Sequence, residues 1–257
     1  MAKRPLRAVF FDVDDTLYST AEFAREARAN AIRAMIGAGL RLSFEAAAAE
    51  LEEVIREFTS NYDRHFDTML LRLPAVSCGR VNPAVIVAAG VVAYHETKRE
   101  RLRAYPDALE ALRALSARPG LCLGVITAGL TVKQAEKLVR LGVLPYLDPR
   151  AVFITEQVGI DKVNPKLYRT ACAALGLEPA ACLFVGDHPA RDADSAKAAG
   201  MWTALLRYGG RDNGKVGQTA PDYVIRGFAE LLAIIDGDFE IADAGDSGRA
   251  GKVRKTE

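Results

Sequence analysis

AVFFDVDDTL, residues 8–17, joins a short apolar run to a cluster of carboxylates. The apolar residues 8–11 predict a buried β-strand, and this strand runs into Asp12, Asp14 and Asp15. Like charges a few ångströms apart raise one another's pKa and resist joint ionisation, so the cluster favours a bound cation. The alternative is that the Asp residues and Thr16 only cap a following helix.

The overall composition indicates a globular protein without a strong charge bias. The chain has 257 residues, of which 50% are hydrophobic and 26% charged, and its net charge is +1. This length suits one core domain with an insertion, and the balanced charge gives no basic field for nucleic acid. The apolar run at residues 8–11 is too short for a signal peptide or a membrane span. We therefore expect a cytoplasmic protein that binds neither nucleic acid nor membrane.

The cysteines show no pattern typical of disulfides or zinc sites. They are far apart and include no CxxC pair: Cys78, Cys122, Cys172 and Cys182. The last three lie in apolar runs or on apolar helix faces. We interpret them as small core residues.

Residues 18–104 have helical periodicity and contain no convincing strand. Ser19 with Glu22 matches a capping box, Ser43 precedes an amphipathic run, and Asn82 with Pro83 begins a further helix. We predict that residues 18–104 form an all-helical cap domain inserted after the acidic turn.

From residue 105 onward, apolar runs alternate with helical patterns. Strands are predicted at residues 121–127, 151–155, 181–185, 202–206 and, at an edge, 223–225, and helices at residues 131–141, 164–175, 192–199 and 228–235. Thr131 with Gln134 is expected to cap the first of these four helices. The alternation predicts an α/β fold, with a doubly wound, Rossmann-like parallel sheet.

The predicted core domain combines residues 1–17 with residues 105–236. Residues 237–257 are rich in Gly, Asp, Ser, Lys and Arg and have no periodicity, so we expect a mobile tail there. The Gly-rich stretch 208–218 precedes no predicted helix and is interpreted as a flexible surface connection.

Polar residues follow the predicted core strands at the points where the strands end. Asp12, Thr127 and Asp187 each take such a position, and Lys162 lies in a loop before a helix. In parallel sheets the carboxyl ends of the strands share one edge, where ligands bind. Carboxylates, a hydroxyl and an ammonium group at one edge predict a site for a Mg²⁺-bound phosphate, and the absence of His or Cys clusters argues against zinc.

These motifs resemble those of the haloacid dehalogenase superfamily, in the subgroup with a helical cap of the C1 type. The first motif, DxDxT, matches residues 12–16, the second matches Thr127, the third Lys162, and the fourth, GDxxxxD, matches residues 186–192. Val163 stands where the family usually has proline after the lysine, which leaves Lys166 as an alternative third-motif residue.

The resemblance implies that Asp12 is the nucleophile and forms an aspartyl phosphate. It also implies that Asp14 protonates the leaving alcohol and then takes a proton from the attacking water. Because halide needs no proton, Asp14 favours phosphate esters over dehalogenation as the substrate class.

The resemblance further implies how metal and phosphate are held. Mg²⁺ would be bound by Asp12, the backbone carbonyl of Asp14, and Asp187. The phosphate oxygens would be bound by Thr127 and Lys162, with backbone N–H groups around Ala128 and Gly129 as further donors. Asp192 would anchor Lys162 or a metal-bound water.

We therefore predict a Mg²⁺-dependent phosphatase for a small phosphorylated metabolite, acting as a monomer or homodimer. Sugar phosphates, glyceraldehyde or glycolate phosphates and nucleoside monophosphates all fit. The alternatives are a phosphomutase and a protein that binds a phosphorylated ligand without turnover.

The predicted cap has one polar, aromatic cluster that could contact the leaving group. Its candidate specificity residues are Tyr62, Arg64 and His65. The alternative is a solvated loop that joins two helices. His188, beside Asp187, is interpreted as a solvent-facing loop residue.

Overall fold

The structure is a computed structural model, and it describes residues 3–59, 61–210 and 214–241. The chain forms two compact units, one of Met1–Tyr18 with Ala104–Glu257 and the other of Ser19–Arg103. The first contains the predicted α/β core and the second the predicted helical insertion. That the second unit closes over a substrate as a cap remains a prediction.

The core unit is built on a six-stranded parallel sheet with the strand order β4-β3-β2-β5-β6-β7. The strands are β2 (Ala8–Phe11), β3 (Cys122–Thr127), β4 (Val152–Ile154), β5 (Cys182–Gly186), β6 (Trp202–Leu206) and β7 (Tyr223–Ile225). The central strand β2 pairs with β3 on one side and with β5 on the other, and Phe11 lies opposite both Val125 and Val185. The order therefore reverses beside β2, which is where ligands bind in such sheets.

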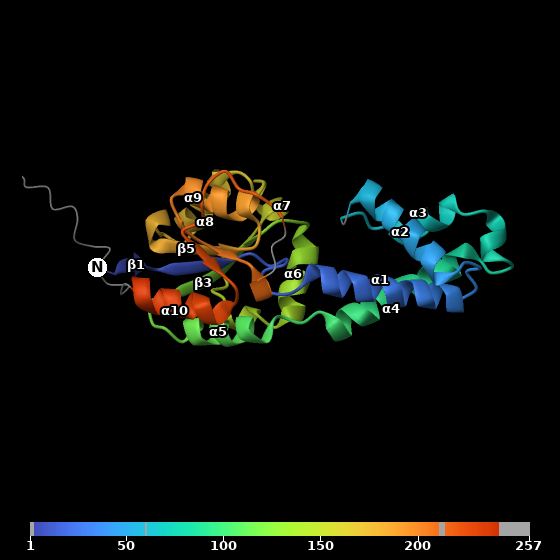
Figure 1. Cartoon of the computed structure of the whole chain (residues 1–257), viewed down its shortest axis with the longest axis horizontal. Helices are drawn as coiled ribbons and strands as arrows, with labels where there is room; N and C mark the ends of the chain where they lie inside the picture. Colours follow the sequence, from blue (N-terminus) through green and yellow to red (C-terminus); the bar gives the residue numbers. More distant parts are fainter. Residues whose placement is uncertain (1–2, 60, 211–213, 242–257) are drawn as a thin grey trace, which may run out of the picture. The chain divides into compact units, whose positions relative to one another are not determined.

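Helices cover both faces of this sheet. Figure 1 shows α8 (Pro165–Ala174) and α9 (Ser195–Ala199) on one face, and α5 (Pro106–Ser116) and α10 (Phe228–Asp238) on the other. Successive residues of a strand point to opposite faces, so Phe10 packs in the cluster that contains Tyr168 of α8 while Phe11 meets the ring of Phe228 at 6.3 Å. The predicted α/β fold is confirmed.

Further helical segments connect the remaining elements of the core. They are α6 (Thr131–Leu141), α7 (Thr155–Val158), the 3₁₀ turns Leu144–Tyr146, Pro179–Ala181 and Tyr208–Gly210, and a π-helical turn at Pro189–Asp194. The predicted capping of α6 by Thr131 and Gln134 is wrong. Leu130 precedes the helix, and the first N–H, of Thr131, is donated to the Glu156 carboxylate at 2.6 Å.

The second unit is helical throughout its described residues. Its α-helices are α1 (Thr20–Gly37), α2 (Phe44–Phe58), α3 (His65–Arg72) and α4 (Pro83–Arg101), with a 3₁₀ turn at Ala75–Cys78. The predicted caps form: the side chains of Ser19, Ser43 and Asn82 each accept a backbone N–H at the start of a helix. Across the described residues, no helix has the length and apolar character of a membrane span.

The prediction that a mobile tail begins at residue 237 is wrong. Gly237 and Asp238 lie in α10, and strand β8 (Phe239–Ile241) pairs in parallel with β1 (Arg4–Leu6). The three-residue strand was too short for its periodicity to be recognised. Residues 242–257 of the predicted tail lie outside the described residues.

Gly124 is required where β3 passes closest to its neighbours. A Cβ atom at this position would lie 2.6 Å from the Ala151 carbonyl oxygen and 2.9 Å from Phe10 Cδ1. We expect Gly124→Ala to lower the free energy of unfolding by about 1–3 kcal/mol in urea denaturation, because the core is overpacked. Gly237→Ala is the control. It lies in α10 with no atom within 4 Å of the added methyl, and we expect it to be neutral or to stabilise by up to about 1 kcal/mol. Equal losses in the two variants would contradict this account.

Candidate active site

The predicted strand-end residues meet at the carboxyl edge of the sheet. Asp12 follows β2, Thr127 is the last residue of β3, and Asp187 follows β5. A cavity of about 200 Å³ lies at this edge, and its lining residues are Asp12, Asp14, Asp15, Ala128, Lys162, Asp187, His188, Arg191, Asp192 and Lys215. The site is therefore strongly polar and contains both carboxylates and cations.

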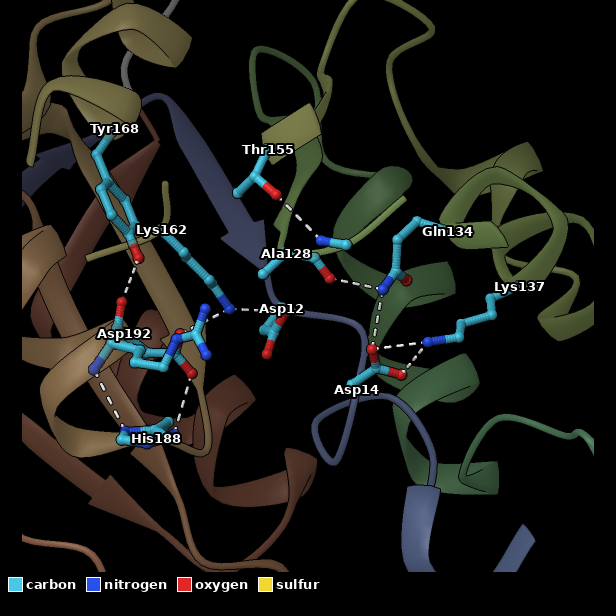
Figure 2. A network of polar contacts seen from close by, with 12 residues as sticks. Asp12, Asp14, Ala128, Gln134, Lys137, Thr155, Lys162, Tyr168, His188 and Asp192 are labelled. Atoms are coloured by element: carbon cyan, nitrogen blue, oxygen red, sulfur yellow. Dashed lines mark hydrogen bonds and ion pairs between the residues drawn. The ribbon is translucent and has the colours of Figure 1, made fainter. Parts of the chain in front are cut away.

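Lys162 is buried between two carboxylates. Its Nζ lies 2.7 Å from Asp12 Oδ1 and 2.6 Å from Asp192 Oδ1 (Figure 2). Burial alone would lower the pKa of Lys162, but the two carboxylates outweigh it and raise the pKa above its ordinary value, so the ammonium stays charged. Lys166, the alternative third-motif lysine, is exposed on the first turn of α8. This geometry favours Lys162.

The carboxylates around Lys162 carry more negative charge than one lysine neutralises. Burial raises the pKa of Asp12 to about 7, against the opposing effect of Lys162, and Asp192 raises it further. Burial, together with Asp192 and Asp15, also raises the pKa of Asp187 to about 6. Oxygens of Asp12, Asp187 and Asp192 lie within 4.8 Å of one another. This donor set, made only of oxygen atoms, fits a hard divalent cation such as Mg²⁺.

Asp192 is held in place by the turn that follows β5. The backbone N–H of His188 donates to Asp192 Oδ2 at 3.0 Å. Gly186 leaves the room for this carboxylate, because a Cβ atom there would collide with it. His188 Nδ1 accepts the N–H of Arg191 at 3.3 Å, and burial, with Lys215 nearby, lowers the pKa of His188. His188 is half-buried and lines the cavity.

The end of β3 and the turn after it contain the predicted phosphate-binding residues other than Lys162. The Thr127 hydroxyl is fully buried and has no hydrogen-bond partner among the described residues. The N–H of Gly129 donates to the Thr155 hydroxyl at 3.0 Å, and the Ala128 carbonyl accepts from Gln134 at 2.6 Å. An unpartnered buried hydroxyl is costly, which is consistent with a ligand for Thr127.

Asp14 has a different environment from Asp12. Its carboxylate accepts hydrogen bonds from Tyr18, Gln134 and Lys137, the last two on helix α6. Burial would raise the pKa of Asp14, but the Lys137 ammonium and these hydrogen bonds outweigh it and lower the pKa. The Asp14 side chain is thus not part of the cluster of Asp12, Asp187 and Asp192. The predicted metal ligand at this residue is its backbone carbonyl, and that prediction stays open.

Comparison with known proteins identifies the family. Residues 6–200 match the model of the haloacid dehalogenase-like hydrolases. The chain belongs to the haloacid dehalogenase-like hydrolase family.

Relatives of this haloacid dehalogenase-like hydrolase include several archaeal proteins named glyceraldehyde 3-phosphate phosphatase. The protein from Methanopyrus kandleri is 43% identical over 90% of this chain and 97% of its own length. Those from Methanocaldococcus jannaschii and Pyrococcus furiosus are 36% and 38% identical, over 90% and 91% of this chain and 97% and 94% of theirs. The predictions of this family and of a phosphoric monoester hydrolase are confirmed.

Solved structures of the same family have the same fold. A HAD phosphatase from Thermococcus onnurineus is 25% identical, with a TM-score of 0.63 over 92% of this chain and 100% of its own. The HAD-hydrolase YfnB from Bacillus subtilis, solved with magnesium, is 19% identical, with a TM-score of 0.62 over 91% of this chain and 100% of its own. The second likeness supports the fold alone.

The three predicted specificity residues of the haloacid dehalogenase-like cap lie in the helical unit. Tyr62 stacks on Phe58 with ring centroids 4.6 Å apart, and His65 Nε2 lies 2.8 Å from the Thr59 carbonyl. Arg64 is exposed and lies 3.5 Å from Asp67. Their contact with a substrate remains a prediction.

Sequence reasoning missed several side chains at the site, including Tyr18, which donates to Asp14. Arg191 and Lys215 line the cavity, although the segment of Lys215 was expected to be a surface connection. Gln134 and Lys137 contact Asp14. Their spacing of three residues, which places them on one face of a helix that follows the second motif, is the signal that could have found them.

Replacing Lys162 tests the buried ion cluster. Lys162→Met would leave Asp12 and Asp192 buried without their cation, so we expect a loss of about 3–5 kcal/mol in the free energy of unfolding. The measurement is urea denaturation at pH 7.5 with a chelator present. Lys166→Met is the matched control and should change stability by less than about 0.5 kcal/mol. Similar losses in both variants would reopen the assignment of the third-motif lysine.

Proposed function

We propose that this chain is a Mg²⁺-dependent phosphatase whose substrate is glyceraldehyde 3-phosphate. The observation that carries the proposal is the similarity to enzymes of that name along nearly their whole length. Because the match spans both compact units, it includes the residues that would contact the leaving group as well as the residues at the edge of the sheet that would carry out the chemistry.

The proposed reaction uses two carboxylates in two steps. Asp14 is ionised in the free site, and the negative charge of a bound phosphate would raise its pKa so that it carries a proton in the complex. Asp12 attacks phosphorus, an Asp12 oxygen–phosphorus bond forms, and the bond to the sugar oxygen breaks while Asp14 gives that oxygen a proton. Water then attacks the aspartyl phosphate, Asp14 takes a proton from the water, and phosphate leaves with Asp12 restored. The nucleophile and the acid thus return to their starting states.

The charges of the site assist this attack. Asp12 and Asp187, with the backbone carbonyl of Asp14, would hold Mg²⁺, which would neutralise the charge between the nucleophile and a phosphate dianion. Lys162 lies 2.7 Å from the nucleophile, and Thr127 has a buried hydroxyl without a partner among the described residues. Both suit the non-bridging phosphate oxygens, and the ion pair of Asp192 with Lys162 fixes the lysine. Ala128 and Gly129 form the adjoining turn.

A phosphate-release assay tests this function. We expect release from glyceraldehyde 3-phosphate to exceed that from phosphoglycolate, glucose 6-phosphate and a nucleoside monophosphate, and to stop with chelator. Asp12→Asn should lower kcat at least about a thousandfold, because the amide is not a nucleophile. Asp236→Asn, a surface carboxylate paired with Arg118, should keep the activity. Saturable binding without release would favour a binding protein, and transfer of the phosphate to another position of a sugar would favour a mutase.

The pH dependence of metal affinity gives a second test. The pKa values of Asp12 and Asp187 are raised to about 7 and about 6, so protons compete with the cation below neutral pH. We expect the apparent Mg²⁺ affinity, measured by isothermal titration calorimetry, to fall at least about tenfold from pH 8 to pH 5.5. Binding at pH 7 should release protons, which appears as a heat that depends on the buffer. An affinity independent of pH would contradict this assignment of the ligands.

A further inference from the structure

We infer that Gln134 and Lys137, on helix α6, are positioning residues that orient Asp14 for proton transfer. This inference rests on the proposed function, in which Asp14 is the acid and base. Neither residue belongs to the four motifs, and both act through Asp14.

Both oxygens of the Asp14 carboxylate are held by these side chains. Lys137 Nζ lies 2.6 Å from Oδ1 and 2.7 Å from Oδ2, and Gln134 Nε2 donates to Oδ2 at 3.0 Å. The Tyr18 hydroxyl donates to Oδ1. Figure 2 shows Asp14 turned toward Gln134 and Lys137, while Asp12 faces Lys162. The direction of the Asp14 carboxylate is therefore set from α6.

Gln134 is a polar side chain on the buried face of α6. It is 4% exposed and lies on the same buried face of α6 as Leu138 and Leu141. Its Oε1 has no hydrogen-bond partner among the described residues, and a buried polar atom in that state is costly. The amide is therefore explained by the two groups to which its Nε2 donates.

The Nε2 group of Gln134 donates hydrogen bonds both to Asp14 and to the phosphate-binding turn. Besides Asp14, it donates to the Ala128 carbonyl at 2.6 Å. Gly129, at φ +141°, leaves room for this amide, because a Cβ atom there would lie 2.6 Å from Nε2. The Gln134 amide thus fixes Asp14 relative to Ala128, the residue that follows Thr127, and a fixed position beside the phosphate-binding turn favours proton transfer to a leaving oxygen.

The proton matters most when the leaving group is a strong base. An alkoxide leaves only if it is protonated, whereas the acetate released from acetyl phosphate needs no proton. Loss of positioning should therefore lower kcat/KM for an alkyl phosphate much more than for acetyl phosphate. A purely structural defect lowers kcat/KM for the two substrates by the same factor. The ratio kcat/KM is the right quantity because it reports the steps up to departure of the leaving group.

The experiment compares both substrates in Lys137→Met and Gln134→Leu. We expect kcat/KM for glyceraldehyde 3-phosphate to fall at least about tenfold, within the range that general acids contribute, and kcat/KM for acetyl phosphate to fall less than about threefold. Lys137→Arg, which keeps a cationic donor, should recover most of the loss. Arg140→Met is the matched control, because it removes the ion pair with Glu136 from the same helix without touching Asp14.

Asp14→Asn separates failure of this inference from failure of the proposed function. If Asp14→Asn lowers kcat/KM equally for glyceraldehyde 3-phosphate and for acetyl phosphate, Asp14 is not the acid and the proposed mechanism fails. If Asp14→Asn lowers kcat/KM more for glyceraldehyde 3-phosphate than for acetyl phosphate, but Lys137→Met and Gln134→Leu lower it equally for both, the positioning inference alone is overturned. When Asp14→Asn is already present, adding Lys137→Met should not widen the difference in kcat/KM between the two substrates, because no acid remains to be positioned.

Discussion

The buried ion cluster of Asp12, Lys162 and Asp192 is the constraint on which the site depends. Each of these residues is at most 7% exposed. A buried charge costs several kcal/mol unless it is paired, so the three side chains must meet in the folded state. They come from the end of β2, the loop before α8 and the turn after β5. Pairing them therefore fixes the carboxyl edge of the sheet as well as the nucleophile.

At the same edge of the sheet, the pKa values of Asp12 and Asp14 are shifted in opposite directions, although these residues are only two positions apart in the chain. The pKa of Asp12 is raised to about 7 by burial, whereas that of Asp14 is lowered by the Lys137 ammonium and by the hydrogen bonds of Lys137, Tyr18 and Gln134. Asp15, with φ at 55°, turns the backbone sharply directly after Asp14. In the proposed reaction a bound cation would favour the ionised form of the nucleophile Asp12, and the negative charge of a bound phosphate would favour the protonated form of Asp14.

Helix α6 connects this division of work to the phosphate-binding turn. Gln134 contacts both Asp14 and Ala128, and Thr155 supports the turn from the other side through the Gly129 N–H. The turn is thus held between two helices rather than by its own backbone alone. Such support restricts how far Thr127 and Asp14 can move apart, which favours a preorganised site.

The sequence by itself determined the strands of the six-stranded sheet and the residues at their ends, because both follow from local patterns. Apolar runs predicted β2, β3, β5 and β6, and parallel strands must bring Asp12, Thr127 and Asp187 to one edge. Only the tertiary structure decided the two partners of Asp14 on helix α6, since Gln134 and Lys137 lie 120 and 123 residues further along the chain. A Thr-x-x-Gln pattern looks the same whether the glutamine caps its own helix or contacts a distant carboxylate. Which of the two forms depends on the surface that the helix face meets, and that surface exists only once the sheet is assembled.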